Sequence, residues 1–279
     1  MKHTTILSVL KHATIHISRT DAEILLATIL KKPREWIMSH PDSSASFVNR
    51  QVMKRMVKRR KKGLPLAYLT GKKAFYGRDF LVTKDTLIPR PETEQYVPLV
   101  QSICTPEAII VDVGTGTGCI PITLEREQIG SAHIGIDISA AALTIATKNA
   151  TRLSANVLFL QGNLLEPLAM HAASTDHLII TANLPYLTKE EILAEPTIAH
   201  EPRLALDGGA NGVALYEHLL MQVKQYKERS SVRIDVIMEI NPHQVQNMQA
   251  LCKRIISTGR ISIHQDLPKK DRFVMLTVA

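Results

Sequence analysis

The chain has 279 residues and a mass of 31.0 kDa, which suits one large domain or a core with a small additional domain. Apolar residues make up 45% of the sequence and charged residues 22%, so we exclude intrinsically disordered and fibrous proteins. Its 34 Lys and Arg residues outnumber its 26 Asp and Glu residues, and the net charge of +8 favours an acidic or nucleic-acid-bearing partner.

The cysteines and the N-terminus indicate the cellular compartment. Cys104, Cys119 and Cys252 are an odd number without a CxxC pair, which argues against a disulfide framework or a zinc site and for a reducing compartment. Lys and His are scattered among the apolar residues of the first 17 positions, and no stretch approaches about 18 uninterrupted apolar residues. We therefore predict a cytoplasmic protein with no signal peptide, no membrane span and no metal.

Every periodic pattern in the first 62 residues is helical, and four helices are predicted. Thr20 with Glu23 three residues later predicts a capping box that opens the second helix. Pro33 suits the first turn of the third helix, and the fourth stops at Gly63 after a basic run. The apolar positions are Ile6, Val9, Leu10 and Ala13, then Leu25, Leu26, Ile29 and Leu30, then Trp36 and Ile37, and last Val48, Val52 and Met56. We predict a helical, substrate-recognition domain at residues 1–63.

Two short β-type runs around Gly77-Arg78-Asp79 predict a β-hairpin linker at residues 64–91. From residue 92 to 279 strand-length apolar runs alternate with helical stretches. The strand candidates are Ala108–Val113, His133–Asp137, Val157–Leu160, His177–Thr181, Val232–Ile240, Ile261–Asp266 and Phe273–Val278, and the helical patterns fall at Ile120–Glu127, Ala140–Arg152, Val213–Lys227 and His243–Ile256. This alternation predicts an α/β catalytic domain with a mostly parallel sheet covered on both faces. The last two strands should pair antiparallel, because the segment between them is too short for a parallel crossover.

The loop after the first of these strands is rich in glycine. It reads Val111-Asp112-Val113-Gly114-Thr115-Gly116-Thr117-Gly118. Alternating glycines let the backbone turn sharply and approach a ligand where a Cβ would collide. Asp137 ends the second strand, 19 residues after the last glycine, where a carboxylate can accept from ribose hydroxyls. A nicotinamide dinucleotide site has GxGxxG spacing, whereas GxGxG here resembles the loop of class I methyltransferases, whose ligand is S-adenosylmethionine.

The segment Asn183-Leu184-Pro185-Tyr186 stands at the carboxyl end of a predicted strand. Ligands of open α/β sheets bind beyond the carboxyl ends of the strands, so this tetrapeptide and the glycine loop should border one crevice. An Asn amide oxygen and a backbone carbonyl can hold both hydrogens of a planar –NH₂ group in line with a sulfonium methyl group. Pro185 stiffens the turn and Tyr186 provides a flat wall.

Further blocks in the sequence are typical of one family. They are Pro65-Leu66-Ala67-Tyr68, Phe75-Tyr76-Gly77, Ile88-Pro89-Arg90-Pro91-Glu92-Thr93-Glu94, Glu201-Pro202 and Ala205-Leu206-Asp207-Gly208-Gly209. With the glycine loop and the tetrapeptide, they make the chain resemble the peptide chain release factor glutamine methyltransferases, the PrmC/HemK family, over nearly its whole length. The resemblance implies a class I, Rossmann-like fold with a seven-stranded sheet and S-adenosylmethionine as co-substrate. It also implies N5-methylation of the glutamine in the Gly-Gly-Gln motif of class I release factors, with the helical domain helping to hold the protein substrate.

The same resemblance assigns the site residues. Those that bind the cofactor are Gly114, Thr115, Gly116, Thr117, Gly118, Asp137, Asn163, Leu164 and Asn183. Those that bind the glutamine amide are Asn183, Leu184, Pro185 and Tyr186, of which Asn183, Pro185 and Tyr186 are the candidate catalytic residues. The chain departs from the family pattern at Leu184, where a second proline is usual, and at Asn163, Leu164 and Asn211. We expect the change at Asn163 to weaken cofactor binding rather than abolish it.

Two other functions stay open. A nucleic-acid adenine N6 methyltransferase acts on the same kind of planar amino group, and the net charge and Leu184 favour it. The four departures suggest instead a non-catalytic protein that binds a release factor or the ribosome. We expect a monomer with class I release factors as partners, no membrane partner and no requirement for nucleic acid. The basic run at residues 54–62 is interpreted as a solvated helix face, with RNA or an acidic protein as alternatives, and Arg90 and Glu92 either brace the cofactor pocket or tie the hairpin to the sheet.

Overall fold

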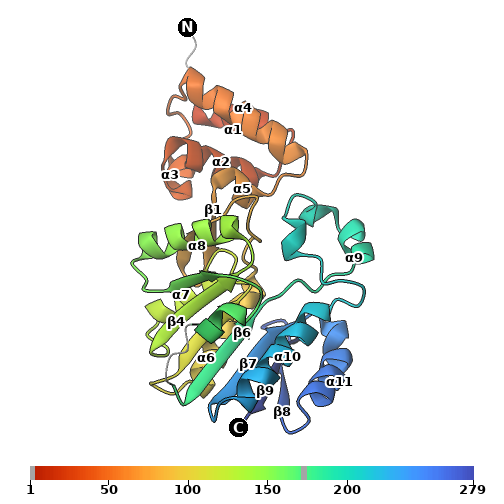
Figure 1. The fold of residues 1–279 in the computed structure, drawn as a ribbon. Coiled ribbons are helices and arrows are strands. Elements are labelled where there is room, and N and C mark those ends of the chain that lie inside the picture. Colours follow the sequence, from red (N-terminus) through yellow and green to blue (C-terminus); the bar gives the residue numbers. More distant parts are fainter. Residues whose placement is uncertain (1–3, 171–174) are drawn as a thin grey trace. The chain divides into compact units, whose positions relative to one another are not determined.

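The protein is described by a computed structural model of residues 4–170 and 175–279. The chain forms two units (Figure 1). The helical unit contains the residues up to Lys72 together with Pro196–His200, and the sheet unit contains Lys73–Glu195 and Glu201–Ala279. Each unit has its own hydrophobic core, and each is described by itself.

The helical unit contains the four predicted helices and a fifth short one. They are α1 (Ile6–Ala13), α2 (Arg19–Leu30), α3 (Arg34–Ser39), α4 (Phe47–Lys61) and α5 (Leu66–Thr70). Their apolar stripes meet in one core, in which Ile6, Leu25, Leu26 and Ile37 are almost completely buried. Pro33 is the N-cap residue of α3, so it precedes the first turn that the sequence predicted it to occupy.

The predicted capping box at Thr20 and Glu23 is wrong. Helix α2 begins at Arg19, and the hydroxyl of Ser18 caps it by accepting a hydrogen bond from the backbone N–H three residues later. Glu23 is buried and pairs with the guanidinium groups of Arg19 at 2.8 Å and Arg34 at 2.7 Å. Two cations therefore draw this carboxylate into the core, and their hydrogen bonds lower its pKa.

The sheet unit contains a two-stranded hairpin and the predicted seven-stranded sheet. The hairpin strands are β1 (Lys72–Phe75) and β2 (Arg78–Leu81), and the sheet strands are β3 (Ile109–Val113), β4 (Ala132–Asp137), β5 (Leu158–Gln161), β6 (His177–Ala182), β7 (Arg233–Glu239), β8 (Arg260–Gln265) and β9 (Asp271–Val278). The strand order is β5-β4-β3-β6-β7-β9-β8. Neighbours from β5 to β7 are parallel, whereas β9 is antiparallel to β7 and β8, as predicted. The strand order reverses between β3 and β6, which is where a ligand crevice is expected.

Helices cover both faces of this sheet (Figure 1). The helices of the sheet unit are α6 (Tyr96–Ile103), α7 (Cys119–Arg126), α8 (Ala140–Leu153), α9 (Lys189–Ala194), α10 (Ala214–Glu228) and α11 (Val245–Ile255), and the sequence analysis had not predicted α6 or α9. Alternate residues of β3 enter different cores: Val111 packs with α10 and α11, whereas Ile110 packs with α6 and α7. The strands are therefore buried on both sides, which explains their nearly continuous apolar sequences.

Two kinds of feature are absent from the described part of the chain. In residues 4–170 and 175–279 no helix combines the length and the apolar character that a membrane crossing requires. Within the same ranges, His, Cys, Asp and Glu side chains do not gather into a group of three or more that could hold a metal ion.

Candidate active site

A pocket of about 300 Å³ lies at the carboxyl ends of the parallel strands of the sheet unit. The predicted site residues that line it are Gly114, Gly116, Asp137, Asn163, Leu164, Asn183, Leu184 and Pro185. These residues follow four different strands, β3, β4, β5 and β6, and are brought together by the strand order. The pocket therefore contains both the glycine loop and most of the tetrapeptide, as the sequence predicted.

The first two glycines of the loop lie at the pocket wall in the left-handed region of backbone space. Gly114 has φ +73° and Gly116 has φ +55°, conformations that cost L-residues with a side chain about 1–2 kcal/mol. A Cβ at Gly114 would lie 3.0 Å from Cδ2 of Leu184, so the absence of a side chain allows the loop to pack against the tetrapeptide. A Cβ at Gly116 would meet nothing closer than 3.9 Å and would project into free space. Gly116 is therefore the glycine best placed for a close approach by a ligand.

The rest of the loop is buried beneath the pocket. Gly118 precedes α7 as its N-cap, and a Cβ there would lie 3.2 Å from the side chains of Ala146 and Phe159. This glycine allows α7 to pack closely on its neighbours, and it does not line the pocket. Thr115 and Thr117 are also buried and do not line it. The structure thus separates the glycines that face the pocket from the one that serves packing.

Asp137 lies at the end of β4 with both carboxylate oxygens directed at backbone N–H groups. Its Oδ2 accepts from Gly116 at 2.9 Å and its Oδ1 accepts from Ser139 at 2.9 Å. A carboxylate oxygen has two lone pairs, so each can accept one further hydrogen bond from a ligand hydroxyl. Burial raises the pKa of Asp137, and the two backbone hydrogen bonds oppose this shift. The residue can therefore both fix the glycine loop and bind a diol.

Asn163 and Leu164 follow β5 and complete this side of the pocket. The Nδ2 of Asn163 donates to Oε1 of Glu166 at 2.9 Å, which leaves the amide oxygen as an acceptor. Leu164 is buried and has φ +53°, so the chain turns sharply at this residue. The neutral amide can therefore still accept a hydrogen bond from an exocyclic amino group.

The side chain of Asn183 is held by two residues from distant parts of the chain. Its Nδ2 donates to Oε2 of Glu239 at 3.1 Å and to the hydroxyl of Thr93 at 3.3 Å. Thr93 in turn donates to Oε2 of Glu239 at 2.9 Å. Thr93 belongs to the Arg-Pro-Glu-Thr-Glu block, and Glu239 ends β7. These three side chains form a buried network directly behind the pocket.

Glu239 is completely buried, and burial is the main cause that raises its pKa to about 7. Its Oε1 has no hydrogen-bond partner among the described residues. Its backbone N–H donates to the hydroxyl of Tyr96 at 2.9 Å, and that hydroxyl donates to the carbonyl of Ala182 at 2.8 Å. Tyr96 therefore joins the ends of β6 and β7, where Asn183 and Glu239 lie. Sequence reasoning missed Glu239, although a single acidic residue at the end of an apolar strand, as at Asp137, was an available signal.

Leu184 is buried, and its backbone N–H donates to the hydroxyl of Tyr216 at 3.2 Å. The same hydroxyl donates to the carbonyl of Glu239. Proline, the usual residue at this position, has no N–H to donate. Tyr216 therefore gives the leucine backbone a partner that compensates for the freedom that proline would remove.

The Leu-Asp-Gly-Gly block braces the tetrapeptide from the other side. Leu187 donates to the carbonyl of Leu206 at 3.1 Å and accepts from the N–H of Gly208 at 2.8 Å. A Cβ at Gly208 would lie 2.5 Å from the carbonyl oxygen of Pro185 and 2.7 Å from Cα of Tyr186. Only glycine allows this close approach of two backbones.

Tyr186 is half-buried and does not line the pocket. Its carbonyl accepts from Nε2 of Gln244 at 2.9 Å, and a Cβ at Gly212 would lie 2.3 Å from that carbonyl oxygen. Burial raises the pKa of the Tyr186 hydroxyl, so this group stays protonated near neutral pH. Gln244 was not identified from the sequence, because it lies 58 residues from Tyr186 and has no motif of its own.

Arg90 pairs with Oε1 of Glu201 at 2.6 Å, and the other oxygen of this buried carboxylate accepts from the N–H of Ile88 at 3.0 Å. Glu201 precedes Pro202, which lines the pocket. Of the two roles left open for Arg90, bracing the pocket is the one that these contacts support.

The comparisons with known proteins agree with this site. The sequence model of the PrmC N-terminal domain matches residues 4–71, and a methyltransferase domain model matches residues 110–198. The release factor glutamine methyltransferase of Bacillus subtilis (strain 168) is 33% identical to this chain over 97% of it and 96% of that protein. The protein of the same name from Enterococcus faecalis (strain ATCC 700802 / V583) is 35% identical over 76% of this chain and 75% of its own length.

Among solved structures, the catalytic domain of hMettl16, crystallised in complex with MAT2A 3′UTR hairpin 6, matches 87% of this chain and 85% of its own. The TM-score is 0.57 and the sequence identity 12%, so this likeness shows the fold alone. Since a third of its positions are identical to the Bacillus subtilis enzyme over almost the full length of both, the chain belongs to the release factor glutamine methyltransferase family, enzymes that use S-adenosylmethionine as methyl donor.

Proposed function

We propose that this protein transfers the methyl group of S-adenosylmethionine to the side-chain amide nitrogen of the glutamine in the Gly-Gly-Gln motif of class I release factors. The observation that carries the proposal is the fixed orientation of Asn183. A carboxylate only accepts hydrogen bonds, so Glu239 selects the orientation in which Asn183 presents its Nδ2 to the network. The Oδ1 of Asn183, a pocket-lining residue, is then left to accept from the substrate.

An acceptor at this position suits an amide nitrogen. The lone pair of an amide –NH₂ group is delocalised into its carbonyl, so the nitrogen is a weak nucleophile. Two acceptors, Oδ1 of Asn183 and the backbone carbonyl of Leu184, can hold both hydrogens and fix the nitrogen in one orientation. S-adenosylmethionine contributes an electrophilic methyl group on a sulfonium when it is bound. Positioning and preorganised dipoles of this kind lower a barrier because they need no rearrangement during the reaction.

The pocket has the donor and acceptor groups that this cofactor needs. We propose that Asp137 binds the ribose hydroxyls through its free lone pairs, since its two backbone hydrogen bonds leave them available. The free oxygen of Asn163 accepts from the adenine amino group, and Gly116 admits the ligand to the loop backbone. Thr115, Thr117 and Gly118 act indirectly, because they lie under the loop and shape it.

Glu239 and Thr93 are proposed as positioning residues, since they contact Asn183 and do not line the pocket. If Asn183 turned over, its Nδ2 would face the hydrogens of the substrate amide, and the acceptor would be lost. The loss of one such preorganised group costs about 10²–10³ in turnover in comparable sites. Buried and without water, Glu239 is well placed to prevent that rotation.

The test is transfer of labelled methyl from S-adenosylmethionine to a purified class I release factor. A matched factor, in which the glutamine of the Gly-Gly-Gln motif is replaced by alanine, serves as the control. Label on the unchanged factor alone supports the proposal. Label on both factors would place the methyl group on another residue. Label on neither factor but on ribosomal RNA or DNA would support the adenine methyltransferase alternative.

A further inference from the structure

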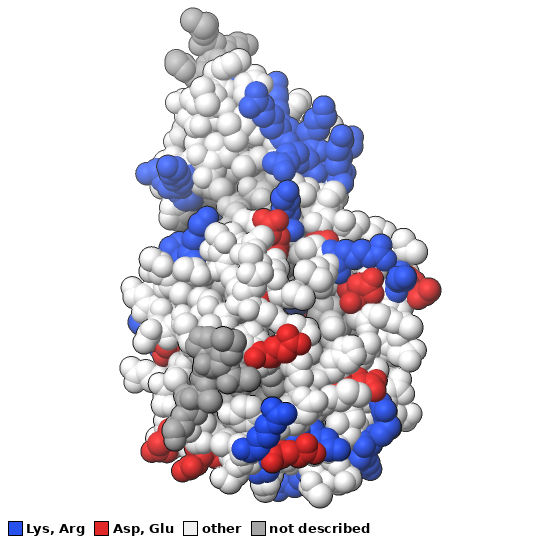
Figure 2. All heavy atoms as spheres, viewed as in Figure 1, with Lys and Arg blue, Asp and Glu red and all other residues white. Residues whose placement is uncertain are grey.

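The positive charge of this protein is confined to its N-terminal part. The first 72 residues contain 15 Lys and Arg against four Asp and Glu, a net charge of +11. The remaining 207 residues contain 19 Lys and Arg against 22 Asp and Glu, a net charge of −3. Figure 2 shows Lys and Arg side chains gathered on the helical unit over α4. The proposed reaction in the sheet unit does not account for this segregation.

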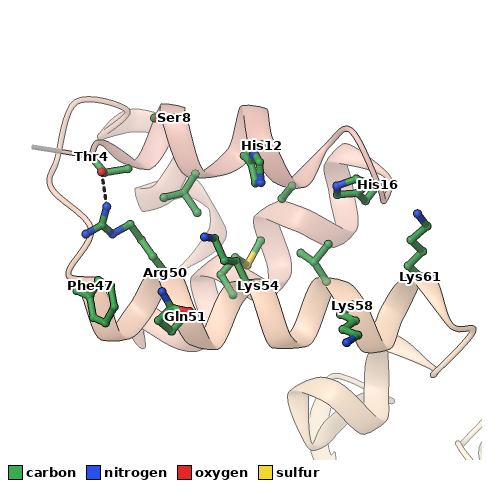
Figure 3. A pocket seen from close by; sticks show the side chains of 14 residues that line it. Thr4, Ser8, His12, His16, Phe47, Arg50, Gln51, Lys54, Lys58 and Lys61 are labelled. Atoms are coloured by element: carbon green, nitrogen blue, oxygen red, sulfur yellow. Dashed lines mark hydrogen bonds between the residues drawn. The ribbon is translucent and has the colours of Figure 1, made fainter. Parts of the chain in front are cut away.

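A groove of about 550 Å³ runs between α1 and α4 within the helical unit (Figure 3). Buried apolar side chains form its floor, and Lys54, Lys58 and Lys61 lie along its α4 side. The described residues that line the groove include no Asp or Glu, and neither helix contains an acidic residue. The three lysines make no ion pair with any described residue, in contrast to Arg60, which pairs with Asp21 at 2.7 Å. The groove is therefore lined by uncompensated cations.

These cations form a row along the axis of α4. Arg50, Lys54, Lys58 and Lys61 are three or four residues apart, so they lie on one face and recur about every 6 Å along the helix. A phosphodiester chain that follows α4 would meet a cation at every helical turn. The groove tracks a backbone, which is the arrangement that single-strand-binding proteins use.

The fold also adds rings that the sequence pattern of α4 lacks. His12 and His16 face the groove from α1, and Phe47 lies at its other end with 66% of its surface exposed (Figure 3). The guanidinium of Arg50 lies 5.6 Å from the centre of the Phe47 ring and donates to the hydroxyl of Thr4. Unpaired bases stack on Phe and His rings and on Arg guanidinium groups. Sequence spacing alone did not show these rings, because α1 and α4 are separate in the chain.

We propose that this groove binds single-stranded nucleic acid, with the phosphates on the α4 lysines and the bases against Phe47 and the α1 histidines. The site lies within the helical unit and is separate from the pocket for the methyl transfer. It requires neither S-adenosylmethionine nor a release factor. Its test therefore does not depend on the proposed function.

The test is the binding of a fluorescein-labelled oligouridylate of about 12 nucleotides to the full-length protein, measured by fluorescence anisotropy across a salt series. Binding should weaken with salt, by about 0.7 in the slope of log affinity against log salt for each phosphate contacted. Changing Lys54, Lys58 and Lys61 together to Ala should reduce that slope by about 2 and weaken binding about tenfold or more at low salt. Phe47→Ala should weaken binding about fivefold or more and leave the slope unchanged.

A matched control removes three exposed lysines from the sheet unit, Lys253, Lys269 and Lys270, and should bind like the wild type. Circular dichroism and thermal unfolding identify any variant that fails to fold. Equal binding of an oligothymidylate would assign recognition to phosphate and stacking, and weaker binding would add the ribose 2′-hydroxyl. The proposal is overturned by the absence of binding at low salt, or by an unchanged slope in the lysine variant. It is also overturned if polyglutamate displaces the oligonucleotide equally well at the same charge concentration, because the groove would then select an acidic polypeptide.

Discussion

Replacing Gly208 with alanine should stop methyl transfer by displacing the tetrapeptide. The new Cβ would lie 2.5 Å from the carbonyl oxygen of Pro185, 2.7 Å from Cα of Tyr186 and 3.0 Å from Cα of Gly212. All three are backbone atoms, so no side-chain rotation relieves the overlap. The Asn183 loop must therefore move away from the Leu-Asp-Gly-Gly block.

The size of the effect follows from this geometry. An ordinary contact is at least 3.4 Å, so the loop must move by about 0.9 Å at Pro185. Overpacking of this kind costs about 1–3 kcal/mol of folding free energy, and each kcal/mol lowers the melting temperature of a unit of this size by about 2–4 °C. A misplacement of about 1 Å at the reacting groups costs about 100-fold in rate, equivalent to about 2.7 kcal/mol in the barrier. We expect kcat/KM of Gly208→Ala to fall about 100-fold while the protein stays folded.

The assay is the rate of labelled methyl transfer to a release factor, together with calorimetric titration of S-adenosylmethionine. Cofactor affinity should change little, since Asp137 and Gly116 do not contact Gly208. Gly77→Ala is the control, because Gly77 also requires glycine, with φ +72°, but has no atom within 4 Å of an added Cβ. It should lower the melting temperature by a similar amount and leave kcat/KM unchanged. A wild-type rate for Gly208→Ala, or an equal loss for Gly77→Ala, would refute the role given to this block.

Three further predictions concern the pocket and the network behind it. Asn183→Ala should abolish detectable methyl transfer in the labelling assay, while calorimetry still detects cofactor binding; normal turnover would contradict its role. Asp137→Asn should weaken S-adenosylmethionine binding about tenfold or more in the same titration, because a charged acceptor of ribose hydroxyls is lost; unchanged affinity would exclude it as the ribose ligand. Glu239→Gln should lower kcat about two- to tenfold at unchanged cofactor affinity, because a glutamine amide both donates and accepts and no longer fixes the orientation of Asn183. Folded Glu239 keeps its proton up to a pKa of about 7, whereas the unfolded chain releases it near pH 4.5, so the stability of the wild type relative to this variant should fall by about 3 kcal/mol from pH 4.5 to 7 and then level off. A pH-independent stability difference in thermal unfolding would show that Glu239 is not held protonated.

The sheet and the pocket could be predicted because their signals are local. Each strand reads as a short apolar run, and the glycine loop, Asp137 and Asn183 each stand directly after one. The rule that ligands bind at the carboxyl ends of strands then brings these residues together without knowledge of the strand order. The same local reading correctly predicted the antiparallel last pair, β8 and β9, from the short connection between them.

The network behind the pocket could not be predicted, because it depends on contacts between distant segments. Thr93 and Glu239 are 146 residues apart, and only the pairing of β6 with β7 brings Glu239 beside Asn183. Gly208 was recognised as part of a typical block, but its reason, the close approach to Pro185, exists only in the folded chain.

Errors at helix ends have a similar cause. Thr20 and Glu23 fit a capping box, yet the nearby Ser18 provides the cap, and Arg34 from the next helix captures the carboxylate. A local motif therefore fails where a neighbouring residue or a tertiary ion pair competes for the same group. Helix α6 was missed because it carries Pro98 near its start, where proline is tolerated in the first turn but reads as a break in the sequence.

The measurement that tests the central claim most directly is mass spectrometry of a release factor after incubation with S-adenosylmethionine and either the wild-type protein or Asn183→Ala. The account predicts a single added methyl group on the side-chain amide of the Gly-Gly-Gln glutamine with the wild-type protein, and none with the variant. A methyl group on any other residue, or equal methylation of the glutamine by the variant, would contradict the claim that Asn183 holds that amide for transfer.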